Sequence, residues 1–101
     1  MAQVTTTPTD HISFDWLCEY VASQWGQLPE LAAEWHEWDI ESRMDFLTDW
    51  PVAESYTEIL FAREGTLLLS DHDAAKAREV RALVERNRPI LEELEARIHE
   101  K

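Results

Sequence analysis

Three polar residues in the middle of the chain, His36, Asp39 and Arg43, have the types and spacing to bind a small anionic ligand. If the segment from 29 to 49 is helical, Asp39 and Arg43 are one turn apart and all three project between two apolar faces. An arginine beside a histidine can bind a carboxylate or a phosphate. The structural alternative is an Asp39–Arg43 ion pair that ties this helix to its neighbours, because a buried charge needs a partner.

The familiar metal-site patterns are incomplete. A zinc motif H-E-x-x-H starting at His36 would need a histidine where the chain has Ile40, and the di-iron pattern E-x-x-H lacks its carboxylate. Asp71, His72 and Asp73 stand at an expected helix start, where acidic residues interact favourably with the helix dipole. We interpret them as helix-start residues, with a surface metal site as the alternative. We predict no metal and no cofactor.

The sequence contains no recognisable catalytic nucleophile. Its single cysteine, Cys18, lies in an apolar helical segment and is predicted to be buried rather than reactive. A G-x-S-x-G motif is missing, and the two glycines, Gly26 and Gly65, cannot form a phosphate-binding loop. Enzymatic activity therefore stays open, but we do not predict it.

The elements that would position these residues are predicted to form an all-α fold, a small bundle of four to five helices. Residues 1–9 should be a flexible N-terminal tail, and residues 10–101 a single domain. The first helix should begin near Thr9, Asp10 or Ser13, which are all good N-caps. It should end at Gly26, where glycine permits a left-handed stop.

The central element is predicted to be a helix from Pro29 to Asp49, with Asp39 as the one place where it could break. A helical wheel gives this segment two apolar faces, so we expect neighbours on both sides. The first face consists of Leu28, Leu31, Trp35, Trp38, Phe46 and Trp50, and the second of Ile40, Met44 and Leu47.

Two further helices are predicted in the second half of the chain. Asp49 followed by Pro51 is typical of a helix end and a new start, so the next helix should span 51–64. The last helix should be capped by Ser70. It is either one long amphipathic helix kinked at Pro89 or two helices that meet there. Its near-heptad apolar stripe consists of Val80, Leu83, Val84, Asn87, Leu91, Leu94 and Ile98.

The surface is strongly acidic, and the charge is unevenly distributed. The formal net charge is -12, and residues 1–64 contain 13 Asp and Glu against 2 Lys and Arg. Such a surface repels nucleic acids and anionic membranes and favours a basic protein partner. The interaction surface predicted from this pattern consists of Glu30, Glu34, Glu37, Glu41 and Asp45.

These observations predict a small acidic helical protein that acts through protein–protein contacts, as an adaptor, a regulatory subunit or an inhibitor. One alternative is a ligand-binding or enzymatic bundle that uses His36, Asp39 and Arg43, and another is a nucleic-acid mimic. A homodimer through the last helix is a further hypothesis, since near-heptad stripes commonly pair. No signal-peptide pattern and no membrane-length apolar run is present, so we expect a cytoplasmic protein.

Overall fold

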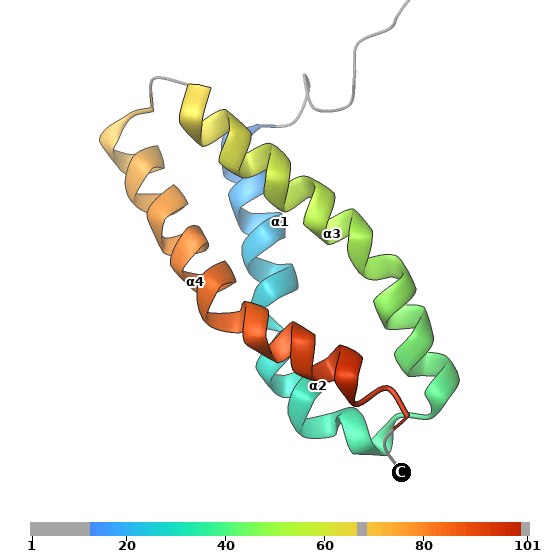
Figure 1. Cartoon of the computed structure of the whole chain (residues 1–101). Coiled ribbons are helices and arrows are strands. Elements are labelled where there is room, and N and C mark those ends of the chain that lie inside the picture. The colour runs from blue at the N-terminus through green and yellow to red at the C-terminus, as the bar shows by residue number, and fades with distance from the viewer. Residues whose placement is uncertain (1–12, 67–68, 100–101) are drawn as a thin grey trace, which may run out of the picture.

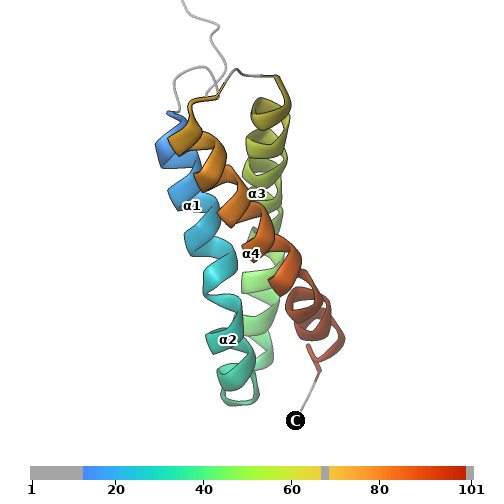
Figure 2. The ribbon, with the colours of Figure 1, turned by 90° about the vertical axis from the view of Figure 1, so that its left-hand side faces the viewer.

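A computed structural model of the chain describes residues 13–66 and 69–99. All regular elements in these two ranges are helical, namely α1 (Phe14–Gly26), α2 (Leu28–Glu34), the 3-10 helix η2 (Trp35–Glu37), α3 (Ile40–Thr66) and α4 (Asp71–Ala96). Figures 1 and 2 show α1 and α2 following one another end to end, so that the described residues form three long helical rods. The all-α class is confirmed. The predicted number of four to five helices is wrong for the described residues, because α1 and α2 together form one rod beside α3 and α4.

The serine caps position two of these rods. The Ser13 hydroxyl accepts a hydrogen bond from the Trp16 N–H at 3.0 Å, and the Ser70 hydroxyl accepts one from the Asp73 N–H at 3.1 Å. Both serines therefore act as the predicted N-caps, while the alternatives Thr9 and Asp10 lie outside the described residues. The first helix ends at Gly26 as predicted, but the left-handed stop is wrong, because the φ of Gly26 is not positive and the next residue keeps a right-handed helical backbone.

The predicted helix from 29 to 49 is divided in two. The break falls at Trp38 and Asp39, between η2 and α3, which is the place where the apolar stripe changes face. The predicted boundary at Asp49 and Pro51 is wrong, since α3 continues through Pro51. Pro51 is exposed, so its ring faces solvent and the carbonyl it leaves without a donor can bond water.

The centre of the core is α1 rather than the segment from 29 to 49. Four side chains of α1 have no solvent exposure, namely Leu17, Cys18, Val21 and Trp25. This helix packs most extensively against α4 and then against α3, whereas α3 and α4 touch less. In the view of Figure 1, α1 crosses the space between α3 and α4, which agrees with its contacts to both helices. The short helix α1 therefore provides the main packing surface for the two long helices α3 and α4.

A polar chain runs through this core. The Trp25 indole N–H donates to the Thr57 hydroxyl at 2.9 Å, and that hydroxyl donates to the Ala53 carbonyl at 2.7 Å. The Asn87 amide donates to the Trp25 carbonyl at 2.9 Å. These hydrogen bonds give the buried donors of Trp25, Thr57 and Asn87 their acceptors, and they join α1 to α3 and to α4.

The last helix is continuous, since α4 contains Pro89 within its length. Figure 1 shows α4 bending where its ribbon turns from orange to red, which the missing N–H and the ring of an internal proline account for. Most of its near-heptad stripe is buried against the same chain, namely Val80, Val84, Asn87, Leu91 and Leu94. The near-heptad stripe on which the homodimer hypothesis rested is therefore mostly buried within a single chain.

Candidate functional site

Arg43 lies at the centre of the predicted site and is buried, with 3% of its surface exposed. Its Nε donates to the Trp35 carbonyl at 3.0 Å, and its Nη1 donates to the carbonyls of Ile98 at 2.9 Å and Arg97 at 3.4 Å. Arg97 and Ile98 follow the last turn of α4, where carbonyl groups lack helical partners and the helix dipole is negative, and Trp35 follows the last turn of α2. Backbone oxygens therefore stabilise the buried guanidinium.

The junction around Arg43 is held by aromatic rings. Trp35 is fully buried, its indole N–H donates to the Arg97 carbonyl at 3.1 Å, and the Arg43 guanidinium carbon is 5.8 Å from its ring centroid. Trp38 and Phe46 pack on the same ring, with centroids 5.5 and 6.0 Å away. Offset and edge-on aromatic pairs of this kind are favourable. They fix the turn between η2 and α3.

Asp39 caps the start of α3. Its Oδ1 accepts a hydrogen bond from the Ser42 N–H at 2.8 Å. The pKa of Asp39 is lowered mainly by hydrogen bonds from the backbone and side chain of Ser42, with a smaller effect from the positive charge of Arg43. His36 is exposed, and its Nε2 lies 3.7 Å from Oε2 of Glu37. The predicted site residues thus have separate roles.

These residues surround an open pocket with a volume of about 470 Å³, at the end of the molecule where α3 begins and α4 ends. Its wall contains His36, Trp38, Asp39, Ile40, Arg43, Ile98 and His99. His36, Asp39 and Arg43, which the sequence analysis grouped together, line the same pocket. Ile98 and His99 were not foreseen, because they come from a segment more than fifty residues away and carry no local pattern that points to Arg43.

The two apolar faces predicted for this region differ in the structure. The first face is confirmed as core, with Leu28, Leu31, Trp35 and Trp50 buried and Trp38 and Phe46 packed against them. The second face is not buried between helices, since Ile40 is 42% exposed, Met44 is 49% exposed and only Leu47 packs partly on the core. The prediction of neighbours on both sides is therefore wrong. An apolar face of α3 is open to solvent.

All five residues of the predicted interaction surface are exposed, but they do not form one helical strip. Glu30, Glu34 and Glu37 belong to α2 and η2, whereas Glu41 and Asp45 follow the turn on α3. The break at Trp38 and Asp39 separates the two groups. Glu41 and Asp45 alone lie next to the open face of α3.

Cys18 is buried, as the sequence predicted. Its side chain has no solvent exposure, and burial raises the pKa of its thiol to about 11 even though the nearby Lys76 acts in the opposite direction. A thiol in this environment is a poor nucleophile. Among the described helices, none combines the length and the apolar composition needed to cross a membrane.

Comparison of the chain with protein-family models, with curated proteins and with solved structures gives no match.

Proposed function

We propose that this protein acts through protein–protein contacts, and that it docks a basic amphipathic helix of a partner on the open face of α3. The observation that carries the proposal is the exposure of Ile40 and Met44 on either side of the buried Arg43. Large aliphatic side chains that stay half exposed in consecutive turns are typical of a recognition surface.

The spacing of these side chains suits a helical partner. Ile40, Met44, Leu47 and Pro51 follow one another at intervals of four, three and four residues, which keeps them on one side of α3. We call these four residues the α3 stripe. It extends for about 16 Å along the helix, and a partner helix can match it with apolar side chains at the same intervals.

Charge determines which kind of helix fits. Glu41 and Asp45 are exposed beside the α3 stripe, and Arg43, the only cation in this part of α3, is buried. A partner with lysine or arginine next to its apolar side chains would be attracted, and its encounter rate would fall as salt screens the charges. A second copy docked through the same stripe would instead bring like charges together.

The pocket extends this surface at one end. Ile40 belongs both to the α3 stripe and to the wall of the pocket, together with Trp38 and Ile98. A docked helix can therefore place one terminal side chain in the pocket, where buried anchors usually contribute most of the binding energy.

The test uses a labelled peptide of about 18 residues, long enough as a helix to cover the stripe. It carries leucine at the matching intervals and lysine on the flanks, and a scrambled peptide of the same composition serves as its control. We expect the amphipathic peptide to bind, and Met44→Glu to weaken binding about tenfold or more, measured by fluorescence anisotropy.

Val52 offers a matched control variant on the same helix. It is 54% exposed, but it lies about 80° around the helix from Met44, off the stripe. Val52→Glu should therefore bind the peptide as the unchanged protein does. Equal effects of Met44→Glu and Val52→Glu, or equal binding of the scrambled peptide, would overturn the proposal.

Self-association is tested in parallel by light scattering at tens of micromolar. The proposal expects a monomer in the absence of the peptide. A dimer that Met44→Glu dissociates would show that a second copy, not a basic partner, occupies the α3 stripe, and it would replace the proposal.

The pocket also supports a second candidate function, the binding of a small anion by His36 and Arg43. Its volume of about 470 Å³ is within the range of ligand pockets. The direction of the Arg43 donors toward backbone carbonyls weakens this candidate. A phosphate titration followed by NMR distinguishes the two, because anion binding should shift the His36 resonances and be lost in His36→Ala without a change in peptide binding.

A further inference from the structure

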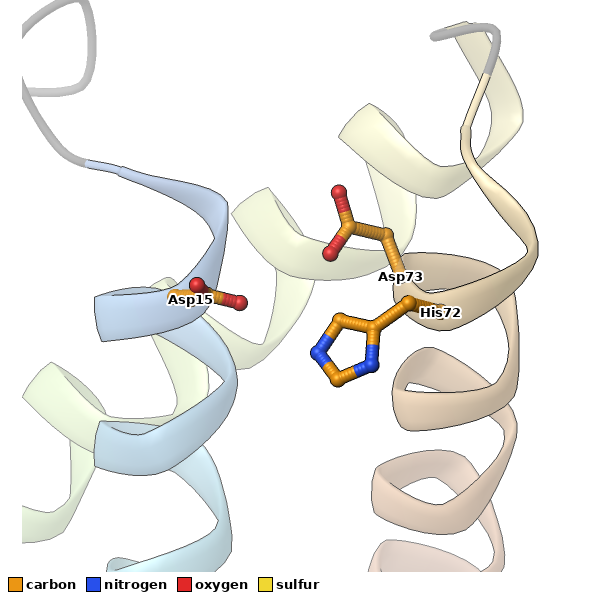
Figure 3. A group of neighbouring side chains, drawn as sticks. All are labelled: Asp15, His72 and Asp73. Carbon is orange, nitrogen blue, oxygen red and sulfur yellow. The ribbon is translucent and has the colours of Figure 1, made fainter.

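Three metal-ligating side chains from two helices meet at the opposite end of α4 from the pocket. Asp15 lies in the first turn of α1, and His72 and Asp73 lie in the first turn of α4. One ligand atom from each residue falls within 4.8 Å of the other two. Among the described residues, this is the one cluster of three or more His, Cys, Asp or Glu side chains close enough to share a metal ion. Figure 3 shows the three side chains directed into the space between the two helix starts.

Two of the three side chains make no hydrogen bond or ion pair to another described residue. Within the described residues, neither the His72 imidazole nor the Asp73 carboxylate makes a hydrogen bond or an ion pair, although the Asp73 N–H bonds to Ser70. Asp15 accepts a hydrogen bond from Lys76 Nζ at 3.3 Å through Oδ1. As far as the described residues show, a nitrogen of His72 and the carboxylate oxygens of Asp73 can therefore act as ligands at this place.

We propose that Asp15, His72 and Asp73 bind one Zn²⁺ ion and so link the start of α1 to the start of α4. One imidazole nitrogen and two carboxylate oxygens suit a divalent first-row metal, whereas Mg²⁺ and Ca²⁺ prefer oxygen ligands alone. Atoms that lie about 2.1 Å from the same ion are about 3–4 Å apart, so rotation of these side chains has to close the gap by roughly an ångström. Water completes the coordination.

This site differs from the one considered along the sequence. Asp71 is next to His72 in the chain, but it is not a member of the group. The third ligand is Asp15, which the packing of α1 against α4 brings to the helix start. A local stretch of sequence could not show this, because the two contributions are 57 residues apart.

Lys76 competes with the ion. Its ammonium nitrogen lies 3.3 Å from Oδ1 of Asp15 and 3.7 Å from Oε2 of Glu19, and it is the cation that these carboxylates hold in the structure. A divalent ion bound at Asp15 is repelled by the ammonium group. Removal of the Lys76 charge should therefore tighten metal binding. If Lys76 served only as a structural ion pair, its removal would lower stability and leave the metal affinity unchanged.

The experiment titrates Zn²⁺ into untagged full-length protein by isothermal calorimetry and measures the melting temperature with and without the ion. We expect one ion per chain and a rise in melting temperature, because an ion that binds only the folded state stabilises it. Excess EDTA should reverse the rise. His72→Ala should weaken binding about tenfold or more, and Lys76→Met should tighten it.

His36→Ala is the matched control, since His36 also lies beside a carboxylate, at 3.7 Å from Glu37, but belongs to no group of three ligands in the described residues. It should bind Zn²⁺ as the unchanged protein does. Because His72 is exposed, His72→Ala should fold normally, which circular dichroism checks. Zn²⁺ binding by His72→Ala with unchanged affinity would overturn the site. Unchanged affinity in Lys76→Met would overturn the competition.

Discussion

Arg43 donates a hydrogen bond of 2.9 Å to the carbonyl oxygen of Ile98, although 55 residues separate them. The bond joins the start of α3 to the residues that follow α4. Carbonyls at a helix end lack backbone donors, and here the N–H groups of the Arg43 guanidinium donate to them instead. In turn these carbonyls keep a buried positive charge solvated, so the two needs are met by one contact.

We predict that Arg43→Met lowers the free energy of unfolding by about 2–4 kcal/mol, because it removes the hydrogen bonds from the guanidinium to the carbonyls of Trp35 and Ile98. Of these two, the Trp35 carbonyl keeps a backbone bond, from the Trp38 N–H. Urea denaturation measures the change. Arg78→Met is the control, since Arg78 is exposed on α4, and it should alter stability by no more than about 0.5 kcal/mol. If the two variants were equally stable, the clamp assigned to Arg43 would be wrong.

Thr57 supports the second prediction. Thr57→Val keeps the shape of the side chain but leaves the Trp25 indole N–H without its acceptor in the core. A buried donor without a partner costs about 1–3 kcal/mol, so the urea midpoint should fall accordingly. Thr48→Val, at an exposed position of the same helix, should have little effect. A loss of the same size in both variants would mean that the indole bond contributes nothing.

The helices could be predicted where apolar spacing and caps agreed. Ser70 caps α4 as expected, Ser13 is the one of three candidate residues that caps α1, and the break at Asp39 coincides with the change of apolar face. The continuation of α3 through Pro51 could not be predicted from the sequence. Proline is common in the first turn of a helix and costly inside one, so Pro51 indicated a new helix start. Its exposed position within α3 is seen only in the structure.

The candidate sites were less predictable, and the reason is distance along the chain. His36, Asp39 and Arg43 are neighbours in sequence and in space, yet two of the carbonyls that bind the Arg43 guanidinium belong to the distant residues Arg97 and Ile98. The exposure of Ile40 and Met44 was missed because a helical wheel shows which residues share a face, but not whether another helix covers it.

Asp39 makes stability depend on pH in a defined direction. Hydrogen bonds from Ser42 hold the pKa of Asp39 below its ordinary value, so the ionised carboxylate stabilises the folded state above the unfolded-state pKa of about 3.9. This contribution is lost as the pH falls through the lower folded-state pKa. Asp39→Ala should therefore lower the urea midpoint at neutral pH and match the unchanged protein at strongly acidic pH. A deficit that stays constant with pH would contradict the assignment.

Cys18 reports on opening of the core. Burial raises its pKa to about 11, so the folded state resists ionisation of the thiol, and stability should fall as the pH rises above the unfolded-state value of about 8.5. At pH 8 a disulfide reagent should label Cys18 only as fast as the protein unfolds, and urea should accelerate labelling. Ser23→Cys in a Cys18→Ala background is the exposed control on α1 and should react at once. Equal rates in native buffer would show that α1 separates from its neighbours without global unfolding.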